Sequence, residues 1–162
     1  HIPFPVTGRD GVSLADQYGA NEANNWQMTR PQSLWGMHVE NLPNFYLMIG
    51  PQSLNPVTNV TLLCEEQGKY IANLVARMRK QGENEVEPTA AAVADWTQRC
   101  NASADGKVWL RCNNWYMKST KSDVEAGRER SQGMWMDTYE TYLQHVLGGA
   151  GGSQETLLRF RA

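Results

Sequence analysis

The chain has 162 residues, 41% of them hydrophobic and 20% charged, and its formal net charge is −2. This length suits one domain with a sizeable core. The near-balanced charge provides no basic surface of the kind that nucleic-acid-binding proteins carry, so nucleic acid is not an expected partner. The longest apolar run, Phe45–Ile49, is far shorter than the roughly 20 residues that span a bilayer, so no membrane partner is expected.

Three cysteines, Cys64, Cys100 and Cys112, are widely spaced and odd in number. Such a set predicts neither a disulfide framework nor a zinc site, so reduced thiols in a cytoplasmic protein are expected. No charged and apolar N-terminal segment marks a signal peptide. Because the sequence begins at His1 rather than Met, a processed chain or a piece of a longer one is expected.

The first 58 residues contain several turn signals. Asp10–Gly11 predicts a tight turn. A short strand is predicted over residues 35–39. The continuous apolar run Phe45–Ile49, bounded by turn signals, predicts a buried strand of the kind found in parallel sheets. Residues 50–57 contain two prolines, which exclude regular structure there.

Three later segments have helical patterns, at residues 59–81, 90–104 and 135–146. Thr58 or Asn59 is the expected N-cap of the first, and Gly82 ends it. One buried strand cannot form a sheet by itself. Most of the sheet is therefore expected to lie outside this chain.

No catalytic or metal-binding constellation is visible. The three histidines lack metal-ligand spacing, and the chain has neither a nucleophile elbow nor a Gly-x-Gly-x-x-Gly fingerprint. The informative stretch is residues 50–60, where a predicted strand leads through an irregular loop into a helix. In α/β sheets, ligands often bind in the crevice where the strands lead into such loops, and a helix N-terminus favours anionic groups. A plain connection without a ligand stays open as the alternative.

Several motifs in this stretch and around it also match a known family. They are Gly-Arg-Asp-Gly-Val at 8–12, Asn-Leu-Pro-Asn-Phe-Tyr at 41–46, Ile-Gly-Pro-Gln-Ser at 49–53, Thr-Asn-Val at 58–60, Glu65, Gln67, Tyr70-Ile71, Glu87-Pro88-Thr89, Trp96-Thr97-Gln98 and Asn114-Trp115-Tyr116. In this order and spacing, over about 140 residues, the chain resembles the C-terminal third of a flavin-dependent Baeyer–Villiger monooxygenase of the cyclohexanone monooxygenase type.

The resemblance implies an α/β fold: the helix-rich C-terminal segment of a flavoprotein monooxygenase with two dinucleotide-binding domains for FAD and NAD(P), whose sheet is incomplete in this chain. Residues 1–82 would be the C-terminal part of the FAD-binding domain. Residues 83–162 would be a helical and loop extension near the NADP(H) site. The implied reaction uses FAD and NADPH to insert one oxygen atom of O2 next to a ketone carbonyl, giving an ester or lactone, with a secondary metabolite as the expected substrate.

The same resemblance implies site residues. The expected FAD contacts are Gly50, Pro51, Gln52, Ser53, Thr58 and Asn59. Val57 and Val60 are expected on the substrate side, and Trp115 is expected to contact NADP(H). No catalytic residue is expected in this chain, because the dinucleotide fingerprints and the active-site arginine lie upstream in the family. The N-terminal remainder of the flavoprotein is therefore an expected partner, together with a small-molecule ketone.

One segment departs from the family. After Trp115 the family has a Gly-Ala-Asn-x-Pro-Gly-Lys loop over NADP(H), whereas this chain has Met117–Val124 without its glycines and proline. This departure favours a second hypothesis, a monooxygenase-like protein that binds a metabolite without oxidising it or catalyses a redox-neutral step. A third hypothesis is a small free-standing binding module, against which the unpaired strand argues.

Overall fold

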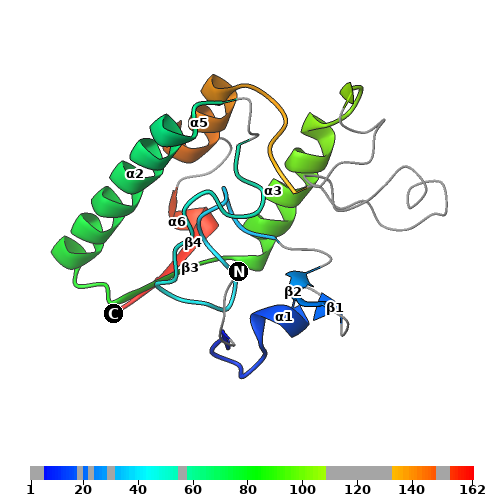
Figure 1. Cartoon of the computed structure of the whole chain (residues 1–162). Coiled ribbons are helices and arrows are strands. Elements are labelled where there is room, and N and C mark those ends of the chain that lie inside the picture. Colours follow the sequence, from blue (N-terminus) through cyan, green and yellow to red (C-terminus); the bar gives the residue numbers. More distant parts are fainter. Residues whose placement is uncertain are drawn as a thin grey trace.

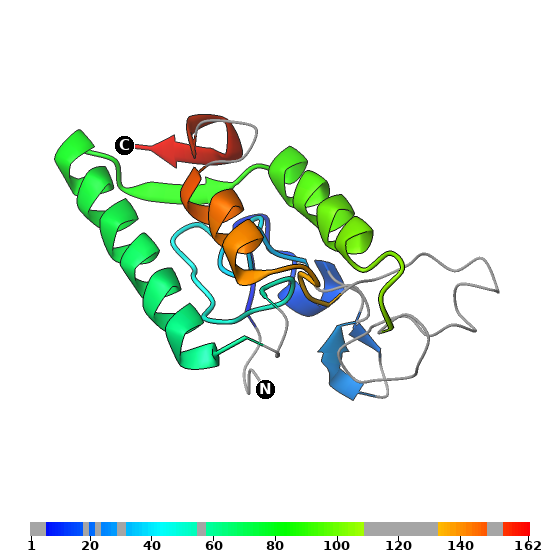
Figure 2. The same ribbon diagram turned by 90° about the horizontal axis from the view of Figure 1, so that it is seen from above.

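Two long helices flank an irregular segment of the N-terminal half of the chain. The structure is a computed structural model that describes residues 6–17, 20–21, 24–28, 32–54, 58–108, 133–148 and 154–162. Helices α2 (Val60–Gln81) and α3 (Ala90–Ser103) lie on either side of the irregular segment 32–54, drawn in cyan (Figure 1). Helix α5 (Tyr139–Gly148) lies between them in the view from above (Figure 2).

Helix α2 forms where the sequence predicted it. The Asn59 side chain caps its beginning, and Gly82 ends it in the left-handed conformation, at φ 73°. The buried positions follow one face of the helix at spacings of three and four residues. They are Leu63, Gln67, Tyr70, Leu74 and Met78. The helix is thus confirmed, with one polar residue on a face that was predicted from apolar residues alone.

The other two predicted helices are also present. Helix α3 begins after Thr89, whose hydroxyl accepts a hydrogen bond from the Ala92 N–H. Helix α5 begins four residues later than predicted, at Tyr139. The reason lies in the preceding segment, where the Trp135 N–H donates to the Ser53 carbonyl at 2.7 Å instead of entering a helix. None of the helices in the described part of the chain is long and apolar enough to cross a membrane.

Two small antiparallel pairs make up the sheet structure of the described residues. Near the N-terminus, α1 (Leu14–Gln17) precedes the pair β1 (Ala20–Asn21) and β2 (Asn24–Met28). The second pair joins β3 (Glu85–Pro88) to the C-terminal strand β4 (Leu158–Arg161), which follows the short helix α6 (Gln154–Leu157). Neither strand of this second pair was predicted from the sequence.

The two predicted strands near the middle of the chain are wrong. The strand predicted at residues 35–39 is instead a turn at residues 35–37, where Trp35 and Gly36 have positive φ of 59° and 73°, followed by an isolated bridge from His38 to Leu34. The run Phe45–Ile49 makes only a single antiparallel bridge, from Tyr46 to His38. Positive φ at both ends of this run, 58° at residue 44 and 54° at residue 49, interrupts the extended backbone that a strand needs. The tight turn at residues 8–11 is confirmed, with the Gly11 N–H donating to the Gly8 carbonyl.

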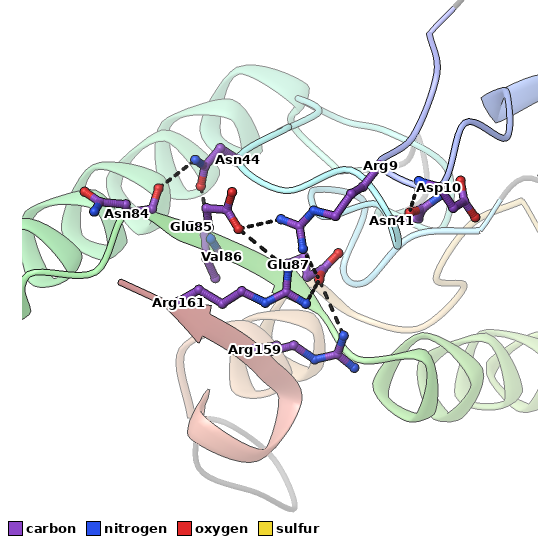
Figure 3. A network of polar contacts seen from close by, with 10 residues as sticks. All are labelled: Arg9, Asp10, Asn41, Asn44, Asn84, Glu85, Val86, Glu87, Arg159 and Arg161. Carbon is purple, nitrogen blue, oxygen red and sulfur yellow. Dashed lines mark hydrogen bonds and ion pairs between the residues drawn. The ribbon is translucent and has the colours of Figure 1, made fainter.

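A cluster of charged side chains fastens the N-terminal turn to the β3–β4 pair (Figure 3). The Glu87 carboxylate, only 9% exposed, lies 3.4 to 3.5 Å from guanidinium nitrogens of Arg9, Arg159 and Arg161. Glu85, which is 42% exposed, also pairs with Arg9 and Arg161. The cluster thereby joins residue 9 to strands about 80 and 150 positions away.

On the opposite edge of β3, Asn44 takes the place of a neighbouring strand. Its backbone N–H donates to the Val86 carbonyl, and its side-chain Oδ1 accepts from the Val86 N–H. Its Nδ2 also donates to the Asn84 carbonyl at 2.9 Å (Figure 3). Strand β3 is therefore bonded on both sides, although its sheet has only two strands.

We expect Glu87→Ala to lower the free energy of unfolding by about 1–3 kcal/mol, because three guanidinium groups lose the one well-shielded carboxylate among them. Glu85→Ala, the matched control, should cost less than about 1 kcal/mol because that carboxylate is exposed to solvent. Urea denaturation of both variants measures the difference. Equal losses would show that burial of Glu87 does not strengthen the cluster.

The main hydrophobic core lies between α2, α3 and α5. It includes Tyr70 and Leu74 of α2, Trp96 of α3, Tyr142 of α5 and Leu158 of β4. Trp96 stacks on Trp135 with ring centroids 5.0 Å apart. Because segment 32–54 contributes Leu34, Met37 and Leu54 to the same core, its irregular backbone is fixed by side-chain packing.

Candidate functional site

Residues 50–53, the candidate loop, form a turn that is fastened at both ends. The Ser53 N–H donates to the Gly50 carbonyl at 3.1 Å. The Gly50 N–H donates to the Gly36 carbonyl at 2.9 Å, and the Ser53 carbonyl accepts from Trp135. These bonds join the loop to the turn at residues 35–37 on one side and to the segment before α5 on the other.

Gln52 points into the protein and is 1% exposed. Its amide oxygen accepts from the Ser33 N–H at 3.1 Å, and its Nε2 donates to the Thr97 hydroxyl at 2.9 Å. Its backbone N–H donates to Gly133, and its carbonyl accepts from the Trp96 indole at 3.0 Å. The side chain of Gln52 thus holds the candidate loop on α3.

Ser53 is fully buried, and Gly36 lies against its backbone. A Cβ atom added at Gly36 would lie 2.3 Å from Ser53 Cβ and 2.7 Å from Ser53 Cα. Gly36 also has a φ of 73°, a conformation that glycine adopts at least cost. The candidate loop therefore packs backbone to backbone against the turn at residues 35–37.

The beginning of α2 follows the candidate loop in the sequence. Asn59 is exposed, and its Oδ1 accepts from the Thr61 and Leu62 N–H groups at 3.0 and 3.3 Å. Thr58 is half-buried, and the side chain of Val60 is 49% exposed. This helix end combines a positive partial charge with exposed polar and apolar groups, a combination that suits a ligand with both anionic and apolar parts.

The structure describes seven of the nine residues predicted for the site. Gly50, Pro51, Gln52 and Ser53 form one loop, and Thr58, Asn59 and Val60 begin α2. Val57 and Trp115 lie outside the described residues, as does the departing segment 117–124. Cofactor and substrate contacts of all nine residues therefore stay predictions. Among the described residues, no group of three or more His, Cys, Asp or Glu could hold a metal ion.

Several buried groups of the core are ionisable but uncharged near neutral pH. Burial lowers the pKa of His38 to about 3, and its Nε2 lies 3.0 Å from the Tyr70 hydroxyl. Burial also raises the pKa of Tyr70 far above its usual value and the pKa of Tyr142 to about 12. These side chains are neutral hydrogen-bonding groups of the core, and of the three Tyr142 is bonded to Gln67, which in turn bonds the loop at Ser53.

Sequence reasoning missed how the candidate loop is held, above all by Gln67 and, through Gln67, by Tyr142. Gln67 is 1% exposed and bonds Ser53, and Tyr142 is fully buried. A signal for Gln67 was present: it lies four residues after Leu63 and three before Tyr70, on the apolar face of α2. A polar residue at such a position indicates a buried hydrogen-bond network.

Comparison with curated proteins finds relatives among monooxygenases, whereas no protein-family model matches the chain. A Baeyer-Villiger monooxygenase of Pseudooceanicola batsensis is 28% identical over 115 residues, which are 71% of this chain and 19% of that protein. An uncharacterized monooxygenase of Mycobacterium tuberculosis is 30% identical over 118 residues, 71% of this chain and 22% of that protein. Cyclohexanone 1,2-monooxygenase of an Acinetobacter species is 24% identical over 115 residues, 71% of this chain and 19% of that protein.

Solved structures of monooxygenases contain a segment with the same fold as this chain. An oxidized steroid monooxygenase bound to NADP matches with a TM-score of 0.77 and 22% identity, over 97% of this chain and 26% of that one. OTEMO in complex with FAD and NADP matches with a TM-score of 0.76 and 20% identity, over 97% of this chain and 26% of that one. The chain thus has the fold of a helix-rich α/β segment of the flavoprotein monooxygenases. The predicted resemblance to Baeyer–Villiger monooxygenases is confirmed, and the chain spans about a fifth to a quarter of the length of the proteins it matches.

Proposed function

We propose that the chain forms part of an FAD- and NADPH-dependent Baeyer–Villiger monooxygenase that inserts one oxygen atom of O2 next to a ketone carbonyl. The observation that carries this proposal is the similarity to Baeyer-Villiger and cyclohexanone monooxygenases over 71% of the chain. An ester or a lactone would be the product, and a secondary metabolite is the proposed ketone substrate.

The candidate loop and the beginning of α2 fit a role in holding FAD. The loop is fixed by backbone bonds at Gly50 and Ser53, so it can serve as a rigid wall for a planar ring system. The end of α2 supplies positive potential, and Thr58 and Asn59 supply polar groups. When bound, reduced FAD supplies the activation of O2, and the residues of this chain orient it and exclude water.

The proposal assigns the rest of the site to other polypeptide. The N-terminal remainder of the flavoprotein would supply the dinucleotide fingerprints and the active-site arginine. Residues 1–82 would complete its FAD-binding domain, and residues 83–162 would extend towards NADP(H). The small covered share of each relative, 19% to 26%, supports this division. We place the assembly in the cytoplasm, where unpaired thiols such as Cys64 and Cys100 stay reduced.

The experiment that tests the proposal measures flavin and turnover together. The full-length flavoprotein that contains this chain is purified, its FAD content is determined from the visible spectrum, and NADPH oxidation is followed with a panel of ketones. We expect bound FAD, ketone-stimulated NADPH consumption and an ester or lactone by mass spectrometry. A protein that binds neither FAD nor NADPH would refute the proposal.

A second function is favoured by the altered segment after Trp115. Its sequence, Met117–Val124, lacks the glycines and proline with which the family loop covers NADP(H). A monooxygenase-like protein that binds a metabolite without oxidising it, or that catalyses a redox-neutral step, would tolerate this loss. Bound FAD without NADPH-driven product formation would support this second function over the first.

We expect Trp115→Ala to raise the KM for NADPH about 5- to 30-fold, because loss of an aromatic stacking partner removes about 1–2 kcal/mol of binding energy. Steady-state kinetics of the full-length flavoprotein provide the measurement. Trp109→Ala in the same segment is the matched control and should leave the KM unchanged. Unchanged kinetics in Trp115→Ala would refute its assignment to NADP(H).

A further inference from the structure

Gln67 is the polar exception on the buried face of α2. It is 1% exposed and lies between the buried residues Leu63 and Tyr70. A leucine at this position would fill the core without any need for hydrogen bonds. A buried amide is kept at no net cost only where its donor and acceptor groups find partners. The partners of Gln67 therefore indicate its purpose.

Those partners lie at the two ends of the candidate loop. The Gln67 amide oxygen accepts from the Ile49 N–H at 2.9 Å, just before the loop. Its Nε2 donates to the Ser53 hydroxyl at 3.1 Å, at the end of the loop. One side chain thus spans residues 49–53. Ile49 has a positive φ of 54°, an uncommon conformation for a β-branched residue, and the bond from Gln67 helps to hold it.

Tyr142 of α5 fixes the orientation of this amide. Its hydroxyl accepts from Gln67 Nε2 at 2.8 Å and donates to the Trp35 carbonyl at 2.6 Å. Since Tyr142 stays protonated at any physiological pH, the direction of these bonds is fixed. Both Nε2 protons and the amide oxygen of Gln67 are then used, and a flipped amide would place donors against the Ile49 N–H.

We propose that Gln67, oriented by Tyr142, is the positioning residue that sets the backbone conformation of residues 49–53 and thereby the surface that this loop presents to the flavin. The first half of this inference concerns the chain alone, and the second half rests on the proposed function. Gln67 acts through the loop and touches no reacting atom itself. Helix α5, distant in sequence, is thereby connected to the candidate flavin site through this buried amide.

The test compares Gln67→Leu and Tyr142→Phe with Tyr70→Phe. The control removes an equally buried hydroxyl from α2, but one whose partner is His38 rather than the loop. All variants are made in the full-length flavoprotein. Hydrogen exchange of the Ile49 amide is measured first, followed by the FAD dissociation constant and the visible absorption spectrum of the bound flavin.

We expect Gln67→Leu to speed exchange of the Ile49 amide about tenfold, the effect of losing one buried hydrogen bond, and Tyr142→Phe to act in the same direction. Both should weaken FAD binding and shift the flavin absorption bands. Tyr70→Phe should lower the melting temperature without changing either signal. If Gln67→Leu does not fold, Tyr142→Phe decides the question by the same measurements.

The outcomes test the two halves of the inference separately: the positioning of the loop by Gln67, and the link between the loop and the flavin. Unchanged Ile49 exchange in the loop variants would overturn the positioning role of Gln67. Faster exchange with an unchanged flavin spectrum and affinity would overturn its link to the flavin. A parent protein without FAD would refute the proposed function and with it the flavin link, while the exchange measurement would still decide the role of Gln67 in the loop.

Discussion

Gly36→Ala should destabilise the protein by about 2–5 kcal/mol and displace the candidate loop. The expected loss has two sources. A φ of 73° costs a residue with a Cβ atom about 1–2 kcal/mol, and forcing a methyl group into a filled space costs about 1–3 kcal/mol more. The added atom would lie 2.3 Å from Ser53 Cβ and 2.9 Å from Ser53 N, so the backbone of one segment has to move.

Gly82→Ala is the matched control, because Gly82 has the same φ of 73° but no atom within 4 Å of an added Cβ. Only the conformational cost applies there, so we expect a loss of about 1–2 kcal/mol. Urea denaturation gives the two free energies of unfolding, and under the proposed function the FAD content of the full-length protein reports on the loop. Equal losses in both variants would show that the contact between Gly36 and Ser53 is not tight.

The second large effect is a loss of stability in mild acid caused by His38. Burial lowers the pKa of His38 from 6.5 to about 3, so the folded protein keeps this side chain neutral. The unfolded chain binds a proton below pH 6.5, and protons therefore favour unfolding as the pH falls from 6.5 towards 3. Between pH 6.5 and pH 3 this proton uptake lowers the free energy of unfolding by about 4–5 kcal/mol in all, of which about 2 kcal/mol is lost by pH 5.

His38→Phe isolates this contribution from that of the carboxylates. Phenylalanine can keep the edge-on contacts that His38 makes with Tyr46 and Tyr70, at centroid distances of 5.3 and 5.6 Å. The variant loses stability at pH 7.5, because the Tyr70 hydroxyl has no partner, but it should lose about 2 kcal/mol less than the parent between pH 7.5 and pH 5. Identical pH profiles would show that His38 titrates normally in the folded protein.

Local sequence signals predicted the helices well. Asn59 and Gly82 have the capping roles expected of them, and Thr89 caps α3. These elements depend on residues close to one another in the sequence. The β3–β4 pair was missed because its strands lie about 70 residues apart, and the ion pairs of Glu87 with Arg159 and Arg161 become visible only when the strands meet.

The candidate site was predictable only in part. Its loop was located from a family motif, but the inward direction of Gln52 was not, since a motif does not show which way a side chain points. The run Phe45–Ile49 was misassigned because an apolar run fits a strand as well as a half-buried irregular segment. Hydrogen bonds from Gln67 to residues 49 and 53 involve tertiary contacts, which no local pattern describes.

The most direct test of the account is a native mass spectrum of the purified protein from its natural source. Under the proposed function, in which this chain completes a flavin site together with further polypeptide, we expect a species much heavier than 18.2 kDa that includes this polypeptide and one FAD. An 18.2 kDa species without flavin that unfolds cooperatively would contradict the account and establish a free-standing binding module instead.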